Sequence, residues 1–193
     1  KGVWTATIQN NSAQKLDMYT YVSDQASHWG AGVGFRSDTT SAMTTCWPST
    51  ADSAISVAAF TGHEGPPYDS KREPVGALRA YSGRGPRVDG VPTIDIAAPD
   101  NPITTINRLD QRGQPWIGWA SYGVFGGTSG AGPHVAAAVA MLLEVEPGLT
   151  ADQVKTRLKS RAMVDAQVTP GDGWGAGKLR IDRLLFANFF ADN

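Results

Sequence analysis

The chain has 193 residues, a formal net charge of −1 and one cysteine, Cys46. The length suits one domain with a small appendage, and 41% hydrophobic against 18% charged residues argues against intrinsic disorder. The balanced charge provides no attraction to nucleic acid or to an anionic membrane, and a single cysteine excludes an internal disulfide framework and a multi-cysteine zinc site.

The first part of the chain has the composition of strands followed by a loop. Residues 2–22 place strand-forming side chains on both sides of a polar turn at residues 9–12, which predicts an antiparallel pair. Residues 23–50 consist mostly of Ser, Thr, Gly and Asp with scattered aromatic residues, which predicts a long loop.

Two short apolar runs follow, and each suits a buried strand. The first is AISVAAF at residues 54–60, and the second is TIDIAA at residues 93–98, which Pro99 ends. The run AYSGRGP at residues 80–86 lies between them and predicts a tight turn.

Two helices are predicted in the last third of the chain. The first is the alanine-rich stretch from Val135 to Val145, and Pro133 suits its first turn, where a missing N–H group is tolerated. This helix is apolar nearly all round, so we expect it to be central and buried, and its apolar run is too short for a membrane span of about 20 residues. Thr150 and Gln153 form a capping-box pattern that opens the second helix. Strands mixed with helices predict an α/β layered fold.

The segment that indicates chemistry is FGGTSGAGPHV, residues 125–135. Small residues allow a sharp turn and the close approach of a ligand, and the helix that follows presents N–H groups without helical partners. The Ser129 hydroxyl lies where those groups converge, which is the layout of a serine nucleophile beside an oxyanion hole. From the residues alone, two alternatives stay open: a tight loop packed on a core helix with Ser129 as an ordinary cap, and a phosphate-binding loop, although the P-loop lysine and the GxGxxG spacing are absent.

Residues 127–136, GTSGAGPHVA, resemble the nucleophile motif of the subtilisin-like serine proteases (subtilases). Three further blocks resemble that family in the same order: PSTADSAISV at residues 48–57, SGRGP with IDIAAP within residues 82–99, and GWGAGKLRID at residues 173–182. The resemblance covers residues 48 to about 186. It implies that residues 48–193 are the C-terminal part of a subtilisin-like parallel-sheet fold with helices packed on it, and that residues 1–47 are a small β-rich insert with a long loop.

The resemblance implies a role for each matching residue. Ser129 takes the nucleophile position, its backbone N–H group is an oxyanion donor, and the Thr128 hydroxyl is an auxiliary donor. Gly130 stands where the family often has Met, which predicts a larger space beside the nucleophile. Asp100 stands where Gly usually follows Ala-Pro in the family, which argues against the family's usual turn at this position. The implied substrate is a polypeptide, and the implied location is secreted or in the cell envelope.

The resemblance implies no certain cofactor, and calcium is the candidate. Carboxylates that could bind calcium are those of Asp89, Asp95 and Asp100. Their spacing fits no EF-hand, so roles in turns or at strand ends are favoured for these three residues.

Two members of the catalytic triad are missing from the sequence. The family order is Asp, His, Ser, yet neither the Asp-Thr/Ser-Gly nor the His-Gly-Thr motif occurs, and the oxyanion Ala-Gly-Asn is also absent. The histidines are His28, His63 and His134, and five helical steps place His134 about 140° around the axis from Ser129. We therefore expect this chain alone to be inactive, and to be part of a longer serine endopeptidase whose upstream half supplies the Asp, His and Asn. The alternative is a catalytically silent subtilase-like module that binds or acts as a scaffold.

Overall fold

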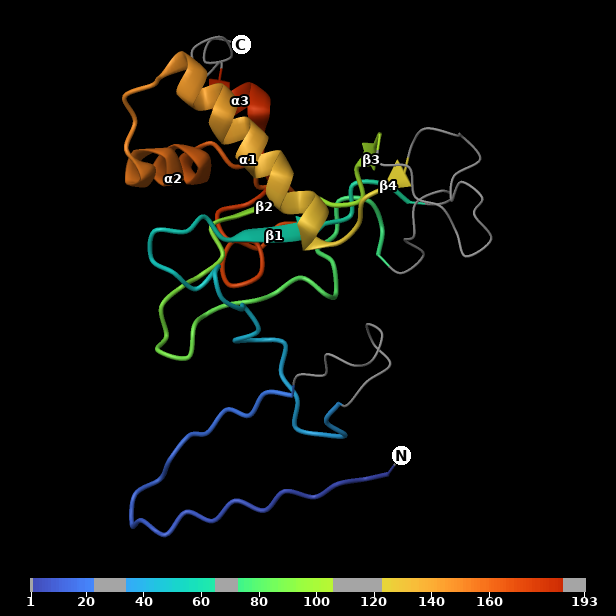
Figure 1. Cartoon of the computed structure of the whole chain (residues 1–193), viewed down its shortest axis with the longest axis vertical. Coiled ribbons are helices and arrows are strands. Elements are labelled where there is room, and N and C mark those ends of the chain that lie inside the picture. Colours follow the sequence, from blue (N-terminus) through green and yellow to red (C-terminus); the bar gives the residue numbers. More distant parts are fainter. Residues whose placement is uncertain (1, 23–33, 65–72, 106–122, 186–193) are drawn as a thin grey trace. The chain divides into compact units, whose positions relative to one another are not determined.

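The computed structural model describes residues 2–22, 34–64, 73–105 and 123–185. By its internal contacts the chain divides into two compact units, residues 1–39 and residues 40–193. All helices and strands of the described residues lie in the second unit (Figure 1). They are β1 (Val57–Phe60), β2 (Ile96–Pro99), β3 (Ile103–Thr104), β4 (Gly123–Val124), α1 (Thr128–Val145), α2 (Ala151–Ser160) and α3 (Ile181–Leu185).

The N-terminal unit differs from the sequence-based prediction. Residues 2–22 run as exposed, extended chain with no strand, so the predicted antiparallel pair does not form. The polar turn does form, and Asn10 Nδ2 donates to the Gln14 carbonyl at 2.7 Å. Two strands without a third strand or a covering helix are marginally stable in water, which explains why the alternating pattern alone does not produce a ladder. The predicted boundary of the insert at residue 47 stays a prediction.

The central sheet pairs β1 with β2 in parallel, with Val57 opposite Ile96. Single bridges extend it on both sides: Leu78 pairs antiparallel with Phe60 of β1, and Lys178 pairs parallel with Ala97 of β2. Both strands lie within or beside the two runs that the sequence predicted, although each is shorter and begins about three residues later. A second, small sheet pairs β3 with β4 in antiparallel fashion.

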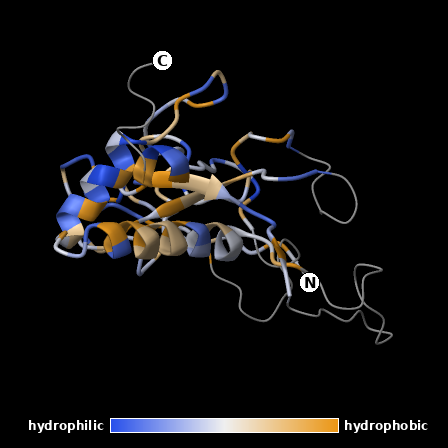
Figure 2. Ribbon diagram, turned by 90° about the horizontal axis from the view of Figure 1, so that it is seen from above, coloured by the Kyte–Doolittle hydropathy of each residue, from blue (hydrophilic) through white to orange (hydrophobic). Residues whose placement is uncertain are grey.

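Both faces of the parallel pair are covered, as a near-continuous apolar sequence requires. On one face, small and branched side chains of the strands pack against all three helices; the buried members of this cluster are Ala59, Ile96, Ala98, Ala131, Val135, Ala138, Leu142, Val154, Leu158 and Leu184. On the other face, Ala58 and Ala97 pack with Val168 and Trp174. Figure 2 shows the hydrophobic colour concentrated on the strands and on the helix beside them. The predicted α/β fold, a parallel sheet with helices packed on it, is confirmed.

Helix α1 departs from its prediction in two ways. It begins at Thr128 rather than Val135, so Pro133 lies inside the helix and not in its first turn. In an α-helix, the carbonyl of Ser129 would normally accept a hydrogen bond from the N–H group of residue 133. Because Pro133 has no N–H group, this hydrogen bond is missing. The helix is also buried on one side only, and Met141 and Val145 are 45% and 64% exposed. Within the described residues, none of the helices is long and apolar enough to cross a membrane.

Helix α2 confirms the predicted capping box. The Thr150 hydroxyl accepts from Gln153 N at 3.3 Å, and Gln153 Oε1 accepts from Thr150 N at 2.8 Å. Val154 and Leu158 are buried on the same face, as expected from their spacing. Reciprocal capping therefore satisfies N–H groups at the start of the helix that would otherwise have no partner.

Replacing Thr150 with alanine should lower the free energy of unfolding by about 1 kcal/mol, because one helix-start N–H group loses its acceptor. Chemical denaturation followed by circular dichroism measures this loss. Thr156→Ala, on the same helix, serves as the control, and an equal loss in both variants would contradict the capping explanation.

Candidate active site

Ser129 lies in the first turn of α1, directly after the turn at Gly127. Gly127 has φ 83°, a backbone conformation that favours glycine, and its carbonyl accepts from Gly130 N at 2.9 Å and Ala131 N at 3.4 Å. The N–H groups of Thr128 and Ser129 donate to no acceptor in the part of the chain that the structure describes. The hydroxyl thus lies at a helix start with unused N–H donors. Its role as nucleophile, and the oxyanion roles of Ser129 N–H and Thr128, stay predictions.

A cleft of about 480 Å³ lies beside these residues, and both Thr128 and Ser129 are exposed on its wall. The rest of its lining comes from the loop before β1, the beginning of β1, the turn that follows Ala80, the segment before β2 and the second turn of α1. These lining residues are Thr44, Thr45, Cys46, Trp47, Ser49, Ile55, Ser56, Val57, Tyr81, Gly83, Ile94 and Gly132. The serine hydroxyl is therefore open to a ligand of substantial size.

The turn after β2 supports the loop that carries Ser129. Asn101 has φ 54°, and its Oδ1 lies 2.7 Å from the position that a Cβ on Gly126 would occupy. The Pro102 carbonyl accepts from Phe125 N at 3.0 Å. A Cβ on Gly130 would lie 2.5 Å from the Phe125 carbonyl oxygen and 2.8 Å from Pro102 Cδ. The prediction that Gly130 enlarges the space beside the nucleophile is therefore wrong, because neighbouring backbone and the proline ring fill that space.

The described histidines do not complete a triad. His134 Nδ1 is paired with the Gly130 carbonyl at 2.9 Å on its own helix, and neither His63 nor His134 lines the cleft. His28 lies outside the described residues. Asn101 is buried against Gly126 and does not line the cleft either.

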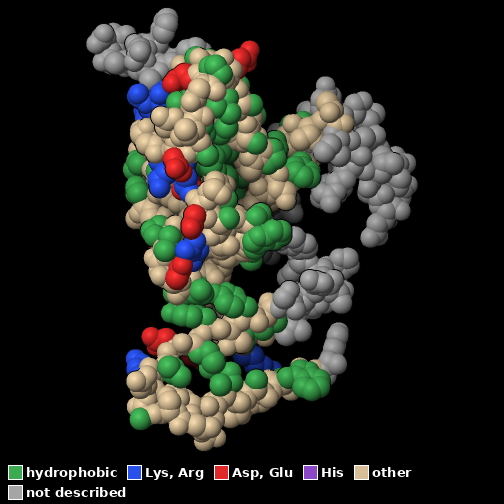
Figure 3. Space-filling view, turned by 60° about the vertical axis from the view of Figure 1, so that its left-hand side comes forward, with side chains coloured by type: hydrophobic (Ala, Val, Ile, Leu, Met, Phe, Trp, Pro, Cys, Tyr) green, Lys and Arg blue, Asp and Glu red, His purple; other side chains and the backbone are tan. Residues whose placement is uncertain are grey.

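The aspartates considered for calcium are engaged by basic side chains. Asp95 Oδ2 accepts from Ser56 N at 2.9 Å and lies 3.1 Å from Lys155 Nζ, while Lys159 Nζ lies 3.6 Å from Asp95 Oδ1. The hydrogen bond from Arg87 lowers the pKa of Asp89 to about 2. Figure 3 shows acidic and basic side chains adjoining one another in this way on one face.

Asp100 pairs with Arg79 at 2.6 Å. Within the described ranges, no three His, Cys, Asp or Glu side chains are grouped so that they could hold a metal ion. These residues therefore do not fit a calcium site, because cationic side chains already occupy the places that a metal would take.

Sequence reasoning missed the polar cluster behind the nucleophile loop, in which Arg79 and Asp100 are buried and Tyr81 is partly exposed. From the sequence, Asp100 is interpreted as a departure from the family motif and as a calcium candidate, and no role is assigned to Arg79 or Tyr81. A weak signal existed, since Arg79 and Tyr81 lie within the three residues before the SGRGP block that begins at Ser82. Their contact with Asp100 depends on how Leu78 pairs with β1, which no local pattern predicts.

Comparison with curated proteins identifies extracellular and subtilisin-type proteases. The chain is 36% identical over 114 residues to the minor extracellular protease Vpr of Bacillus subtilis, a match that covers 56% of this chain and 14% of the relative. It is 38% identical over 114 residues to an extracellular protease of Xanthomonas campestris, covering 58% and 18%. Subtilisin of Bacillus pumilus is 33% identical over 120 residues, covering 57% and 40%. The matches thus span at most 40% of the length of these relatives.

Solved structures agree with these relatives. Fervidolysin of Fervidobacterium pennivorans, a keratinolytic enzyme related to subtilisin, superposes with a TM-score of 0.52 at 25% identity, over 72% of this chain and 20% of that one. The CspB protease of Clostridium perfringens gives 0.52 at 23% identity, over 74% and 28%, which supports the fold alone. The sequence also matches the model of the subtilase family over residues 4–175. The chain therefore belongs to the subtilase family.

Proposed function

We propose that this chain carries the nucleophile of a serine endopeptidase that hydrolyses peptide bonds through an acyl-enzyme on Ser129. The observation that carries the proposal is the exposed Ser129 hydroxyl at the start of α1, beside a cleft and next to N–H groups that have no acceptor among the described residues. Ser129 Oγ forms a bond to the scissile carbonyl carbon, its proton passes through a base to the leaving amine, and the C–N bond breaks. Water then hydrolyses the ester and restores the hydroxyl.

We further propose that an upstream segment supplies the triad Asp and His and the oxyanion Asn. Support comes from the absence of their motifs in the sequence and from the half-covered state of α1. This helix has no charged residue before Glu144, yet several apolar side chains on it stay exposed: Ala136, Ala137, Ala140 and Met141. A helix of this composition is normally covered on all sides, so the exposed face suits the remainder of a catalytic domain.

The proposed substrate is an extended polypeptide, and the proposed location is outside the cell. The printed names of two relatives describe extracellular proteases, which supports secretion. The cleft mixes polar groups with exposed apolar side chains such as Trp47, 84% exposed, and such a surface suits a peptide with side chains of both kinds.

Labelling by a fluorophosphonate probe tests the proposal in the polypeptide that contains both the upstream segment and this chain. Ser129→Ala should abolish labelling and lower kcat by on the order of 10⁶-fold, because the attacking oxygen is removed. Ser160→Ala on α2 is the matched control and should label like the unsubstituted protein. Retention of activity in Ser129→Ala, or labelling at another serine, would overturn the assignment.

The alternative of a silent binding module is favoured by one observation, namely that neither described histidine lines the cleft with Ser129. Under that alternative, the longer polypeptide would bind peptides in a filter or calorimetric assay but would not react with the probe. Reaction at Ser129 excludes it.

A further inference from the structure

A buried ion pair lies behind the loop that carries Ser129. Asp100 directly follows β2, and its side chain is fully buried; Arg79 is 3% exposed. Arg79 Nε donates to Asp100 Oδ2 at 2.6 Å, and Arg79 Nη1 donates to Glu73 Oε2 at 3.1 Å. The pair is thus held from both ends, because Glu73 Oε1 also accepts from Ala80 N at 3.0 Å. A charge buried this deeply is stable only while its partners stay in place.

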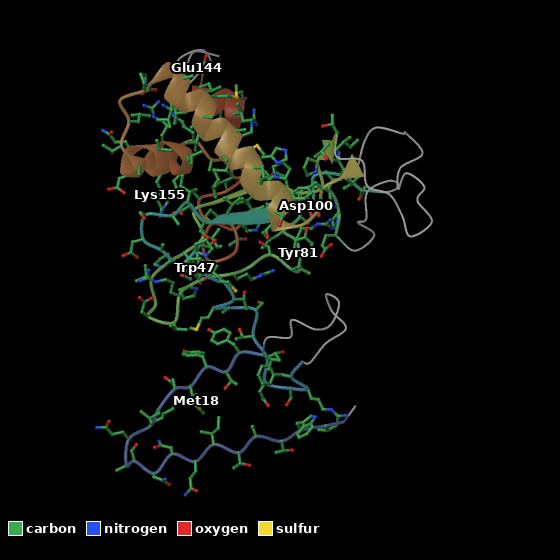
Figure 4. All side chains as sticks on the ribbon, viewed as in Figure 1. Met18, Trp47, Tyr81, Asp100, Glu144 and Lys155 are labelled. Atoms are coloured by element: carbon green, nitrogen blue, oxygen red, sulfur yellow. The ribbon has the colours of Figure 1, made fainter. Side chains whose placement is uncertain are left out.

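Tyr81 connects this ion pair to the cleft. Its hydroxyl donates to the same Asp100 oxygen that Arg79 contacts, and the Arg79 guanidinium lies 5.4 Å from the centre of its ring. Burial, together with Asp100, raises the pKa of Tyr81, so the hydroxyl keeps its proton and remains a donor. Figure 4 shows Tyr81 next to Asp100. Tyr81 also lines the cleft together with Ser129.

The two residues that follow Asp100, namely Asn101 and Pro102, contact the loop that carries Ser129. Asp100 N donates to the Phe60 carbonyl at 2.9 Å, which fixes this residue to the end of β1. The next residue, Asn101, packs its side chain over Gly126, and its backbone N lies 3.5 Å from the Cβ position of Gly130. Glycine at both positions permits this close approach, so a shift of the Asp100 turn would be transmitted to the loop by direct contact.

We propose that Arg79 and Tyr81 are positioning residues for Ser129, and that they act through Asp100 and the turn that follows it. The inference rests on the proposed function, since it assigns a role in the same reaction. Neither residue exchanges a proton or forms a bond in the reaction. They hold the Asp100 turn against the loop, so that the Ser129 hydroxyl and the N–H groups of the helix start keep one mutual geometry.

Three variants of the longer, active polypeptide test this role. Arg79→Met should lower kcat by about 10- to 100-fold while KM changes by less than about threefold, because a misplaced nucleophile slows chemistry more than binding. Tyr81→Phe removes one hydrogen bond and keeps the ring, and kcat should fall by about 3- to 10-fold. Arg79→Lys keeps the charge but not the planar donor geometry, so its kcat should lie between that of Arg79→Met and that of the unsubstituted protein.

A double variant separates positioning from simple stabilisation. Arg79→Met with Asp100→Leu replaces the buried pair by apolar side chains of similar size, which commonly restores stability. If the pair positions Ser129, the melting temperature recovers while kcat stays low. If kcat recovers together with the melting temperature, or if Arg79→Met leaves kcat unchanged, the inference is wrong.

Arg157→Met is the matched control. It breaks another Arg–carboxylate pair, with Glu146 at 2.8 Å, on a part of α2 outside the cleft, and it should leave kcat unchanged. Fluorophosphonate labelling of the unsubstituted longer polypeptide tests the proposed function separately from the positioning role. Absence of labelling there would refute the proposed function, whereas normal labelling with unaffected Arg79 and Tyr81 variants would refute the positioning role alone.

Discussion

Ser129 in the isolated 193-residue chain should react with a fluorophosphonate at least about 10⁴-fold more slowly than in the longer polypeptide. A serine hydroxyl without a neighbouring base stays protonated at neutral pH and is a weak nucleophile. Removal of one triad member from a serine protease costs between about 10⁴- and 10⁶-fold in kcat. In the described residues of this chain, His134 is bonded to the Gly130 carbonyl and no histidine lines the cleft, so nothing takes the proton from Ser129.

Intact-mass spectrometry after timed exposure to the probe measures this difference. The unfolded chain in guanidinium provides the background rate for an ordinary serine. The isolated chain should stay within about 10³-fold of that background, since only the helix-start N–H groups remain to stabilise the developing charge, and one such donor contributes about 10²- to 10³-fold at most. Rapid, stoichiometric labelling of the isolated chain at Ser129 would mean that a base lies within these 193 residues, and it would contradict the upstream origin of the triad.

The position of the candidate nucleophile was predictable because its determinants are local. A run of small residues followed by an apolar stretch indicates a sharp turn into a helix, and the structure has that turn at Gly127 with Ser129 in the first turn of α1. The capping box of α2 was predictable for the same reason, since Thr150 and Gln153 satisfy each other's N–H groups.

The start of α1 was not predictable from propensity. Gly130 and Gly132 are poor helix formers and Pro133 normally marks a first turn, so the sequence favoured a later start. Gly130 lies in the first turn of the helix although glycine is a poor helix former, because the Phe125 carbonyl oxygen and Pro102 Cδ approach it so closely that no side chain fits there. Tertiary packing therefore overrides propensity at this site.

Long-range pairing explains the other differences. The contact of Arg79 with Asp100 joins residues 21 positions apart, and it exists only because Leu78 pairs with one edge of β1 while β2 pairs with the other. Conversely, residues 2–22 have a strand-like pattern, but the described residues of the N-terminal unit contain no further strand or helix of the kind that such a pair needs. A local pattern indicates what a segment can form, whereas its neighbours in space decide whether it does.

Gly175→Ala should be among the most destabilising single substitutions in the chain, lowering the free energy of unfolding by about 2–5 kcal/mol. Gly175 has φ 60°, and an added Cβ would lie 2.4 Å from the Asp95 carbonyl carbon and 2.7 Å from the Ile94 carbonyl oxygen. Both neighbours are backbone, which cannot rotate away as a side chain would. Left-handed strain and overpacking therefore act at the same residue, and the loss is a large share of the 5–15 kcal/mol that typically stabilises a domain.

Gly132→Ala provides the matched control, since this glycine is helical and an added Cβ would meet nothing within 4 Å. Alanine there should raise stability by up to about 1 kcal/mol, so the same substitution at two positions is expected to act with opposite sign. Thermal unfolding followed by circular dichroism should show a fall in melting temperature of about 5–15 °C for Gly175→Ala and a small rise for Gly132→Ala. Equal melting temperatures would show that the turn at residues 171–175 does not pack on Asp95 as described. The Gly175 contact also matters for the site, because Asp95 immediately precedes β2, the strand that leads to Asp100 behind the Ser129 loop.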